Sequence, residues 1–438
     1  LEGQWLENAE ISLTKESVLA QALTKNLQVI LGKSIDQRSN DEPYVLAKHF
    51  RALDPELGKL RQSLAKMNKR IKEFKTTVTP VMRELPADKQ RKSHVMVKGN
   101  YLVPGESVQA ELPKAFPSLP KGESMNRLGL ARWLVARDNP LTARVTVNRL
   151  WGQLFGRGLV ETQEDFGTQG TFPSHPDLLD WLAVDFMDRE WDQKSMLRTL
   201  VTSMTYRQTS KVSAIHLEKD PDNRLLGRGP RFRLEAEMVR DQALAVSGLL
   251  THKMHGPSVY PPQPEGLWRA AFNGERKWAT SVNDDRYRRG LYIFLRRSVP
   301  YPSMATFDAP NREICVARRI STNTPLQAFV TLNDPAYVEM AQALARRMVH
   351  AGGETLADQL AHGLKLARLE TPQVEQIAAL QELHESELKH YQEHLSEARA
   401  LAEDPLNPLP KDANFAKMAA LTVVANVLLN LDAVMMKY

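Results

Sequence analysis

The sequence predicts a mainly α-helical protein with a multi-helix globular core, long loops, a small β-hairpin near residues 94–108 and a long-helix arm. Three observations predict this fold class. Apolar residues recur at three- and four-residue steps over long stretches, which is the period of a helix. Capping residues stand just ahead of prolines at several places, which marks helix starts. One short segment alternates with a period of two between Gly and Pro turn signals, which is typical of a hairpin.

The length of 438 residues is enough for two to three domains, and the 42% hydrophobic fraction is ample for a buried core. We expect four regions along the chain. They are a helical region with a basic heptad helix at 1–90, a small β element and Pro-rich linker at 91–122, a helical core domain at 123–350, and C-terminal helices at 351–438.

The first long helix is predicted from an apolar seam with alternating three- and four-residue steps. Charge on exposed helix faces is usual, so we interpret the helix as a solvated arm rather than as a nucleic-acid patch. The seam consists of Leu57, Leu60, Leu64, Met67, Ile71 and Phe74, and the other faces carry Lys59, Arg61, Lys66, Lys69, Arg70, Lys72 and Lys75.

The β-hairpin is predicted because Val95 and Val97 fall on one face at a period of two. Gly99-Asn100 and Pro104-Gly105 supply the turn signals, and the proline-rich segment 113–122 follows as a linker.

The core helices are predicted from their start and stop signals. Each start places a capping-type residue shortly ahead of a proline, whose fixed φ suits the first helical turn. The starts are Asn139-Pro140, Ser174-His175-Pro176, Thr324-Pro325 and Asp334-Pro335, and the stops are Gly156 and Gly352-Gly353.

A second long helix is predicted over 372–404, with a heptad seam and an acidic surface. We expect the helices at 56–75 and 372–404 to pack against each other or against adjoining helices as an arm, because an exposed seam of that length is a liability. The alternative is that each seam binds a helix of a partner subunit or of a missing N-terminal region. The apolar segment 421–435 is predicted to be a helix that packs into the core.

Composition excludes several classes of protein. The single cysteine rules out an intrachain disulfide and a C-x-x-C-H haem attachment in this chain, and no stretch approaches the ~20 apolar residues of a membrane span. The net charge of +6 suits an acidic partner, but no zinc finger or Arg/Lys run with interleaved aromatics indicates nucleic acid. His390 and His394 have metal-compatible spacing without a third ligand, so we expect no metal.

The segment around Cys315 is the first candidate site. If 311–320 is helical, Arg312, Cys315 and Arg319 share one face, and the two guanidiniums favour a thiolate. A nucleophile also needs a positioned base, and no histidine is near in sequence, so we predict that Cys315 is buried and structural. Together with Asp308, these three residues are candidate ligand-binding residues.

Two further candidates are Asp165 and His175. Asp165-Phe166-Gly167 spells a kinase metal motif, but the other kinase motifs are absent, so we interpret it as a turn. His175 stands at a predicted helix start, where a capping or packing role is expected ahead of a functional one.

Residues 233–250 carry an apolar stripe of Leu234, Met238, Ala245 and Leu249, with Asp241 on it. A buried carboxylate must be paired, so we predict that Asp241 pairs with an arginine in the interior, and we place Arg240 and Asp241 in structural ion pairs. The many arginines of the chain leave two interpretations open, a network of buried Arg–carboxylate bridges or a pocket for an anionic ligand.

Several long motifs resemble one family. The segments 127–183, SMTYRQTS (203–210), 233–250, REICVARR (312–319) and TNTPLQAFVTLNDP (322–335) look like the planctomycete-specific domain of cytochrome c-linked proteins, a C-terminal domain of unknown function. The resemblance covers about residues 90–350 densely.

The resemblance implies a periplasmic or otherwise exported setting and haem c in a missing upstream domain or in a partner, with no cofactor in this chain. It implies partners among the other domains or subunits of a cytochrome-linked assembly, together with a sulfatase-like companion or an acidic polysaccharide. We therefore expect a binding or docking module that supports a redox or polysaccharide-processing assembly. The alternative is an enzyme acting on anionic, sulfated or uronate carbohydrate, and the family carries over no catalytic residue.

Overall fold

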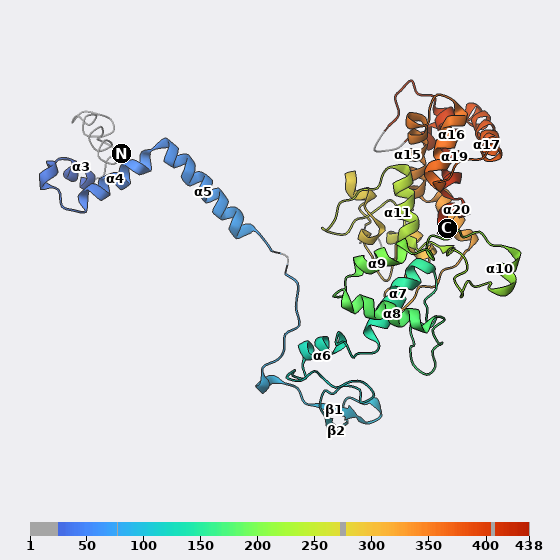
Figure 1. Cartoon of the computed structure of the whole chain (residues 1–438). Coiled ribbons are helices and arrows are strands. Elements are labelled where there is room, and N and C mark those ends of the chain that lie inside the picture. The colour runs from blue at the N-terminus through green and yellow to red at the C-terminus, as the bar shows by residue number, and fades with distance from the viewer. Residues whose placement is uncertain (1–24, 77, 272–276, 404–407, 438) are drawn as a thin grey trace. The chain divides into compact units, whose positions relative to one another are not determined.

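The fold comes from a computed structural model that describes residues 25–76, 78–271, 277–403 and 408–437 (Figure 1). The chain divides into two compact units, residues 1–91 and 92–438. Helices dominate both units, and the strands form only two small two-stranded sheets among the described residues, so the predicted mainly α fold class is confirmed.

Unit 1 is a set of short helices followed by one long helix. Leu27, Ile30 and Leu46 form its small described core. Its elements are α3 (Lys25–Leu31), η1 (Ile35–Gln37), α4 (Glu42–Leu53), α5 (Pro55–Glu73) and η2 (Ala87–Lys89).

Helix α5 confirms the predicted heptad helix. Asp54 caps it by accepting hydrogen bonds from the N–H groups of Glu56 (2.8 Å) and Leu57 (3.2 Å), and Pro55 occupies the first turn. No residue of α5 is buried, and the seam residue Ile71 is 66% exposed. The expectation that this seam is packed is therefore not met by the contacts that the structure describes.

The predicted β-hairpin is confirmed at the start of unit 2. Strand β1 (Ser93–Met96) pairs antiparallel with β2 (Pro104–Val108), and η3 (Val97–Gly99) lies between them. Gly99 adopts φ 74° in this turn, a conformation that glycine tolerates without strain.

Three helices, α7, α8 and α9, build one apolar cluster of unit 2. Val147 and Trp151 of α7 pack with Leu182 and Phe186 of α8 and with Met196 of α9. The elements are α6 (Arg127–Leu134), α7 (Thr142–Phe155), α8 (Pro176–Asp188) and α9 (Gln193–Thr202), followed by α10 (Ala214–Lys219).

The larger cluster of unit 2 surrounds α19. This helix is apolar on all sides, and Leu421, Val424, Ala425 and Leu428 have no exposed surface, so the predicted packing into the core is confirmed. The single helix predicted over 421–435 instead ends at Leu429, and a short helix follows at Asp432–Met435. The elements that follow α10 are β3 (Phe232–Arg233), α11 (Ala236–Ser247), α12 (Leu267–Ala271), η4 (Asn283–Tyr287), η5 (Gly290–Tyr292), α13 (Pro302–Thr306), α14 (Pro325–Asn333), α15 (Pro335–Ala351), α16 (Leu356–Arg368), α17 (Val374–Glu393), α18 (Leu395–Ala402), α19 (Phe415–Leu429), α20 (Asp432–Met435) and β4 (Met436–Lys437).

The predicted helix starts are confirmed where the local signals were explicit. Helices α8, α14 and α15 begin at Pro176, Pro325 and Pro335, and the Asn139 side chain accepts from the N–H groups that open α7. Helix α7 ends at Gly156 with φ 78°, in the left-handed conformation that glycine favours at a helix end.

The prediction of a single helix over 372–404 is wrong in one respect, because the helix is interrupted at His394, which separates α17 from α18. Both helices contact α19, and Ala398 and Ala402 of α18 are fully buried in a cluster with Ala419. The break allows each segment to pack on α19 separately. This helix therefore does pack against adjoining helices, as expected.

The buried face of α11 differs from the predicted stripe. Ala236, Val239, Ala243 and Leu244 are buried, whereas Met238 is 47% exposed. The true stripe follows three- and four-residue steps that include Arg240, so Arg240 is buried and Asp241 lies at the edge of the buried face.

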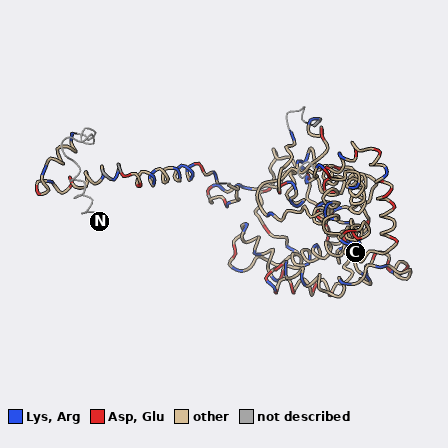
Figure 2. The backbone as a smooth tube through the Cα atoms, turned by 90° about the horizontal axis from the view of Figure 1, so that it is seen from above, with Lys and Arg blue, Asp and Glu red and all other residues tan. Residues whose placement is uncertain are grey.

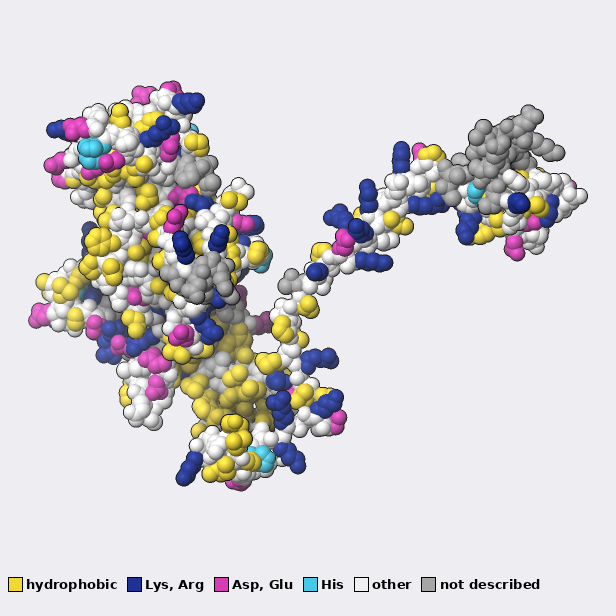
Figure 3. All heavy atoms as spheres, turned by 180° about the vertical axis from the view of Figure 1, so that it is seen from behind, with side chains coloured by type: hydrophobic (Ala, Val, Ile, Leu, Met, Phe, Trp, Pro, Cys, Tyr) yellow, Lys and Arg dark blue, Asp and Glu magenta, His cyan; other side chains and the backbone are white. Residues whose placement is uncertain are grey.

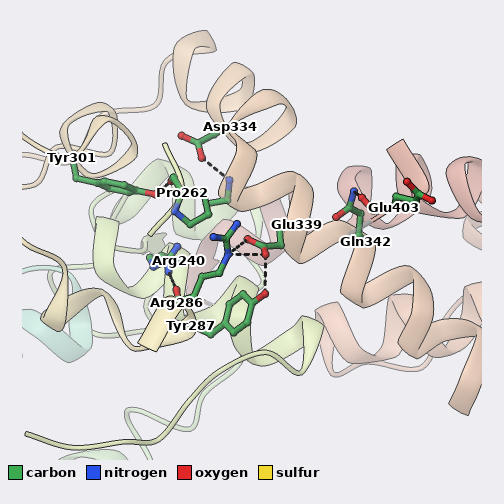
Figure 4. A network of polar contacts seen from close by, with 10 residues as sticks. Arg240, Pro262, Arg286, Tyr287, Tyr301, Asp334, Glu339, Gln342 and Glu403 are labelled. Carbon is green, nitrogen blue, oxygen red and sulfur yellow. Dashed lines mark hydrogen bonds and ion pairs between the residues drawn. The ribbon is translucent and has the colours of Figure 1, made fainter. Parts of the chain in front are cut away.

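The interior ion pair forms between residues other than those predicted. The Arg286 Nε donates to both oxygens of Glu339, at 2.8 and 3.0 Å, and the Tyr287 hydroxyl donates to Glu339 at 2.7 Å (Figure 4). Asp241 does pair with an arginine, but that arginine is the half-exposed Arg289 (3.5 Å). The Asp241 carboxylate also accepts from the Gly290 N–H at 2.6 Å.

Arg240 makes no ion pair with a described residue, which corrects its predicted role. It is 1% exposed and donates to the main-chain carbonyl of Arg286 at 3.1 Å (Figure 4). Arg288 is also fully buried and donates to the carbonyls of Lys253 (3.3 Å) and Pro257 (3.1 Å). Buried arginines of this unit thus fix long loops through carbonyl oxygens as well as through carboxylates.

Within the described ranges, no helix combines the length and the apolar character that a membrane crossing requires.

Because Glu339 satisfies both Arg286 and Tyr287, its replacement leaves a buried guanidinium without its counter-charge. We expect Glu339→Gln to lower the free energy of unfolding by ~3 kcal/mol. The control is Glu370→Gln, which removes the exposed pair between Arg368 and Glu370 (2.7 Å) and costs ~0–1 kcal/mol. Urea unfolding of both variants measures this, and equal losses would contradict the assignment.

Asp334, which caps α15, gives the fold a pH dependence. Burial raises its pKa to about 6, against the lowering effects of the Ala336 N–H and Arg240. Between about pH 4 and 6 the folded chain therefore holds a proton that the unfolded chain has released, so this group's contribution to stability falls as the pH rises.

The Asp334→Asn variant has no such titration. We expect its stability relative to the native chain to improve as the pH rises from about 4.5 to 7, by on the order of 2 kcal/mol. Unfolding curves at several pH values measure the difference, and an offset that stays constant across this range would rule the titration out.

Candidate functional site

The segment 309–321 is a long loop whose two ends are tied together. The Asp308 Oδ2 accepts from both the N–H and the hydroxyl of Thr322, each at 2.7 Å. Asp308 itself adopts φ 61°, which turns the chain out of α13. A surface loop with adjacent ends is a compact, self-contained element, so Asp308 closes the loop rather than contacting a ligand.

The predicted helix over 311–320 is absent, and Cys315 is exposed, so the prediction of a buried structural cysteine is wrong. Residues 310–323 make no backbone–backbone hydrogen bond with the described part of the chain. Pro310 cannot donate one, and Arg312 adopts φ 61°, which a helix does not contain.

Arg319 clamps this loop onto α11. Its guanidinium donates to both oxygens of Glu237, at 2.6 and 3.2 Å, and approaches Glu235 at 3.1 Å. Burial opposes the charged form of Glu237, but the hydrogen bond from Arg319 prevails and keeps the pKa of this carboxyl below its usual value. The two-pronged geometry is the strong form of an Arg–carboxylate contact.

The loop, α7, α11 and β3 enclose a cavity of about 620 Å³, which we call the arginine cavity. Arg149, Gly152, Gln153 and Gly156 reach it from one face of α7. Gly156 is required by its φ of 78° and by close approach, because a Cβ there would lie 2.8 Å from the Phe232 ring, whereas a Cβ at Gly152 would displace only the end of the Gln163 side chain, 2.5 Å away. Other lining residues include Gln163, Phe232, Arg233, Glu235, Met238, Phe307, Asp308, Arg312, Glu313, Cys315, Arg318 and Arg319.

The cations of this cavity are not all neutralised. Arg319 is held by Glu237 and Arg318 by Glu164 (3.3 Å), but Arg149 and Arg312 form no ion pair with any residue that the structure describes. Both are exposed, so their guanidiniums are available to a ligand.

Arg233 adds a partly buried, poorly solvated cation to the same cavity. Burial lowers the pKa of this guanidinium, and Asp432 and Asp308 oppose that effect from a distance. Its Nε is buried without a hydrogen-bond partner, its NH2 contacts the Met435 sulfur at 3.3 Å, and the guanidinium lies 5.6 Å from the centre of the Phe307 ring. An anion in the cavity would compensate a charge that the chain leaves poorly solvated.

The carboxylates of the arginine cavity are already engaged. Glu235 faces Arg319, Asp308 holds Thr322, and Glu313 accepts from the Asn311 amide at 3.2 Å. No histidine is among the described lining residues. The cavity therefore offers unpaired cations, whereas each of these carboxylates already has a partner.

A second cavity, of about 400 Å³, shares Gly156 and Phe232 with the first. Trp151 and Phe155 line it and stack with their ring centres 4.0 Å apart. Its Arg157 is consumed by Glu161 (3.5 Å) and Asp222 (3.4 Å).

Asp165 and His175 line neither cavity. The Asp165 carboxylate accepts from the Gly167 N–H at 2.6 Å, so the predicted turn is confirmed. His175 precedes α8 but makes no side-chain capping bond, and its Nδ1 instead lies 3.0 Å from the Ser174 hydroxyl. The sequence candidates therefore separate into four residues at the arginine cavity and two outside it.

Sequence reasoning did not place Arg149, Gln153 and Arg233 at this site. The first two had a readable signal, because Arg149, Gly152, Gln153 and Gly156 recur at three- and four-residue steps and leave one face of α7 without apolar side chains. Arg233 had none, since the β3–β4 pairing joins residues about 200 positions apart.

Comparison with known proteins gives one match. The model of PSD1, a family described as protein of unknown function (DUF1553), matches residues 126–384. No curated protein and no solved structure matches the chain. The family match spans more than half of the sequence and includes α7, α11 and the 309–321 loop, all of which border the arginine cavity. The chain belongs to the PSD1 family of proteins of unknown function (DUF1553).

Proposed function

We propose that this chain is a binding module whose arginine cavity takes an anionic ligand, with a sulfated or uronate-bearing saccharide as the ligand class. The observation that carries the proposal is the pair of guanidiniums, Arg149 and Arg312, that line the cavity without an ion pair to any described residue. Arginine is the side chain best suited to two-pronged contacts with sulfate or carboxylate groups.

The remaining surface of the cavity suits a ligand larger than a simple ion. Its volume of about 620 Å³ is in the range of small-molecule sites. Gln153 and Gln163 offer amides that can hydrogen-bond hydroxyl groups, and Met238 and Phe307 offer apolar contact. We infer the anionic character of the ligand from Arg149 and Arg312, and we infer the saccharide class from the family resemblance.

Binding is favoured over hydrolysis because of the state of the carboxylates. Glycoside hydrolysis commonly uses two carboxyl groups facing the ligand, one as acid and one as base or nucleophile. Here Glu235 and Asp308 are occupied in holding the loop. The enzyme alternative thus lacks a catalytic pair among the described lining residues, although Cys315 supplies a thiol at the cavity.

The wider setting belongs to the same proposal. The resemblance supports an exported module that docks within a cytochrome c-linked assembly, with haem c carried by an upstream domain or a partner. Ligand capture in the arginine cavity would then localise that assembly on an acidic polysaccharide.

Cys315 provides a direct assay, because it is the only cysteine and it lines the cavity. We expect a neutral thiol reagent to label the native chain readily and a sulfated disaccharide to slow this labelling, whereas its desulfated counterpart does not. Arg149→Ala and Arg312→Ala should each weaken the protection roughly tenfold or more, since each removes charge-assisted hydrogen bonds.

The control is Arg198→Ala, which removes an exposed arginine of α9 that lines neither cavity. Each variant's labelling rate without ligand serves as its own baseline. Equal protection by the desulfated disaccharide, or full protection of both cavity variants, would rule the proposal out.

A further inference from the structure

Helix α5 carries an apolar seam that lies open to solvent. Leu60, Leu64, Met67 and Ile71 are between 53% and 66% exposed, and they repeat at three- and four-residue steps. Such a stripe is the packing surface of a two-helix coiled coil. A continuous exposed apolar stripe on a soluble helix marks an interaction site.

The charges around this seam are strongly one-sided. Residues 55–75 contain seven Lys and Arg against Glu56 and Glu73. The helical positions that flank the seam, equivalent to e and g of a heptad, carry Arg61 and Arg70 against Glu56 alone, and Lys75 follows just beyond the helix end at Glu73. Figure 2 marks many Lys and Arg positions along α5, and Figure 3 shows their side chains with hydrophobic ones beside them.

A second copy of this chain fits the seam poorly. In a parallel pair, Glu56 would face Arg61 of the other copy, but no acidic side chain of the helix would face Arg70, and the surplus of positive charge would be doubled. The helix spans only 19 residues, so its pairing depends on favourable flanking contacts. The acidic helix of this same chain, α17, already packs Ile377, Leu380 and Leu383 against the core around α19.

We propose that α5 is the docking site for an acidic amphipathic helix of a protein partner. The occupant would carry apolar residues at heptad spacing and Asp or Glu at the flanking positions that meet Arg61, Arg70 and Lys75. Charge complementarity of this kind selects the partner and speeds association, while the apolar seam supplies most of the affinity. The inference concerns unit 1 and does not depend on the ligand of the arginine cavity.

The test uses the full chain and two synthetic 21-residue peptides with the same Leu seam. One peptide carries Glu at all flanking positions and the other carries Lys. By fluorescence anisotropy we expect the Glu peptide to bind at least roughly tenfold more tightly than the Lys peptide, with an affinity that falls as salt rises. The double variant Leu64→Glu/Ile71→Glu should lose this binding.

Two controls distinguish specific docking from nonspecific binding to exposed apolar side chains. Ile35→Glu removes an exposed apolar side chain (66%) of η1, outside α5, and should leave binding unchanged. The triple variant Arg61→Glu/Arg70→Glu/Lys75→Glu should reverse the preference in favour of the Lys peptide. Equal binding of both peptides, no binding of either, or light-scattering evidence of a dimer that Leu64→Glu/Ile71→Glu abolishes would each overturn the proposal.

Discussion

Helix α19 has to be covered on every side, and this constraint organises unit 2. Its buried residues Leu421, Val424 and Leu428 have no exposed surface, so α15, α17 and α18 must all lie against it. Helix α11 packs in turn on α15, and the Arg286–Glu339 pair fastens the η4 region to α15. A helix without a polar face can be stable in water only inside such a shell.

The candidate site depends on this shell through one clamp. Glu237 stands on α11, whose position is set by the core, and it holds Arg319 of the 309–321 loop with two hydrogen bonds. Asp308 closes the same loop by holding Thr322. The loop needs these side-chain contacts because it has no backbone ladder of its own, and they leave Arg312 and Cys315 facing the cavity. Asp308 and Arg319 thus hold the loop in place, whereas Arg312 and Cys315 are available to a ligand.

Elements of the fold could be predicted where the sequence signal was local. Parts of the site that depend on residues far away in the sequence could not be predicted. Thr324 and Asp334 begin helices and Gly352 ends one, and these residue types are local signals that a sequence displays directly. The break at His394 depends on packing against α19, which no local pattern encodes. Helical spacing misplaced Cys315, because Arg312, Cys315 and Arg319 share that spacing by coincidence in a loop. The burial of Arg240 was not predicted, because its partner is a main-chain carbonyl, and no acidic residue in the sequence indicates such a contact.

Calorimetric titration of the full chain with a sulfated oligosaccharide and its desulfated counterpart tests the central claim most directly, namely that Arg149 and Arg312 form an anion site. The account predicts binding of the sulfated compound alone, weakening as salt rises, and its loss in the double variant Arg149→Ala/Arg312→Ala. Equal binding of the desulfated compound, or binding by the double variant with unchanged affinity, would contradict the account.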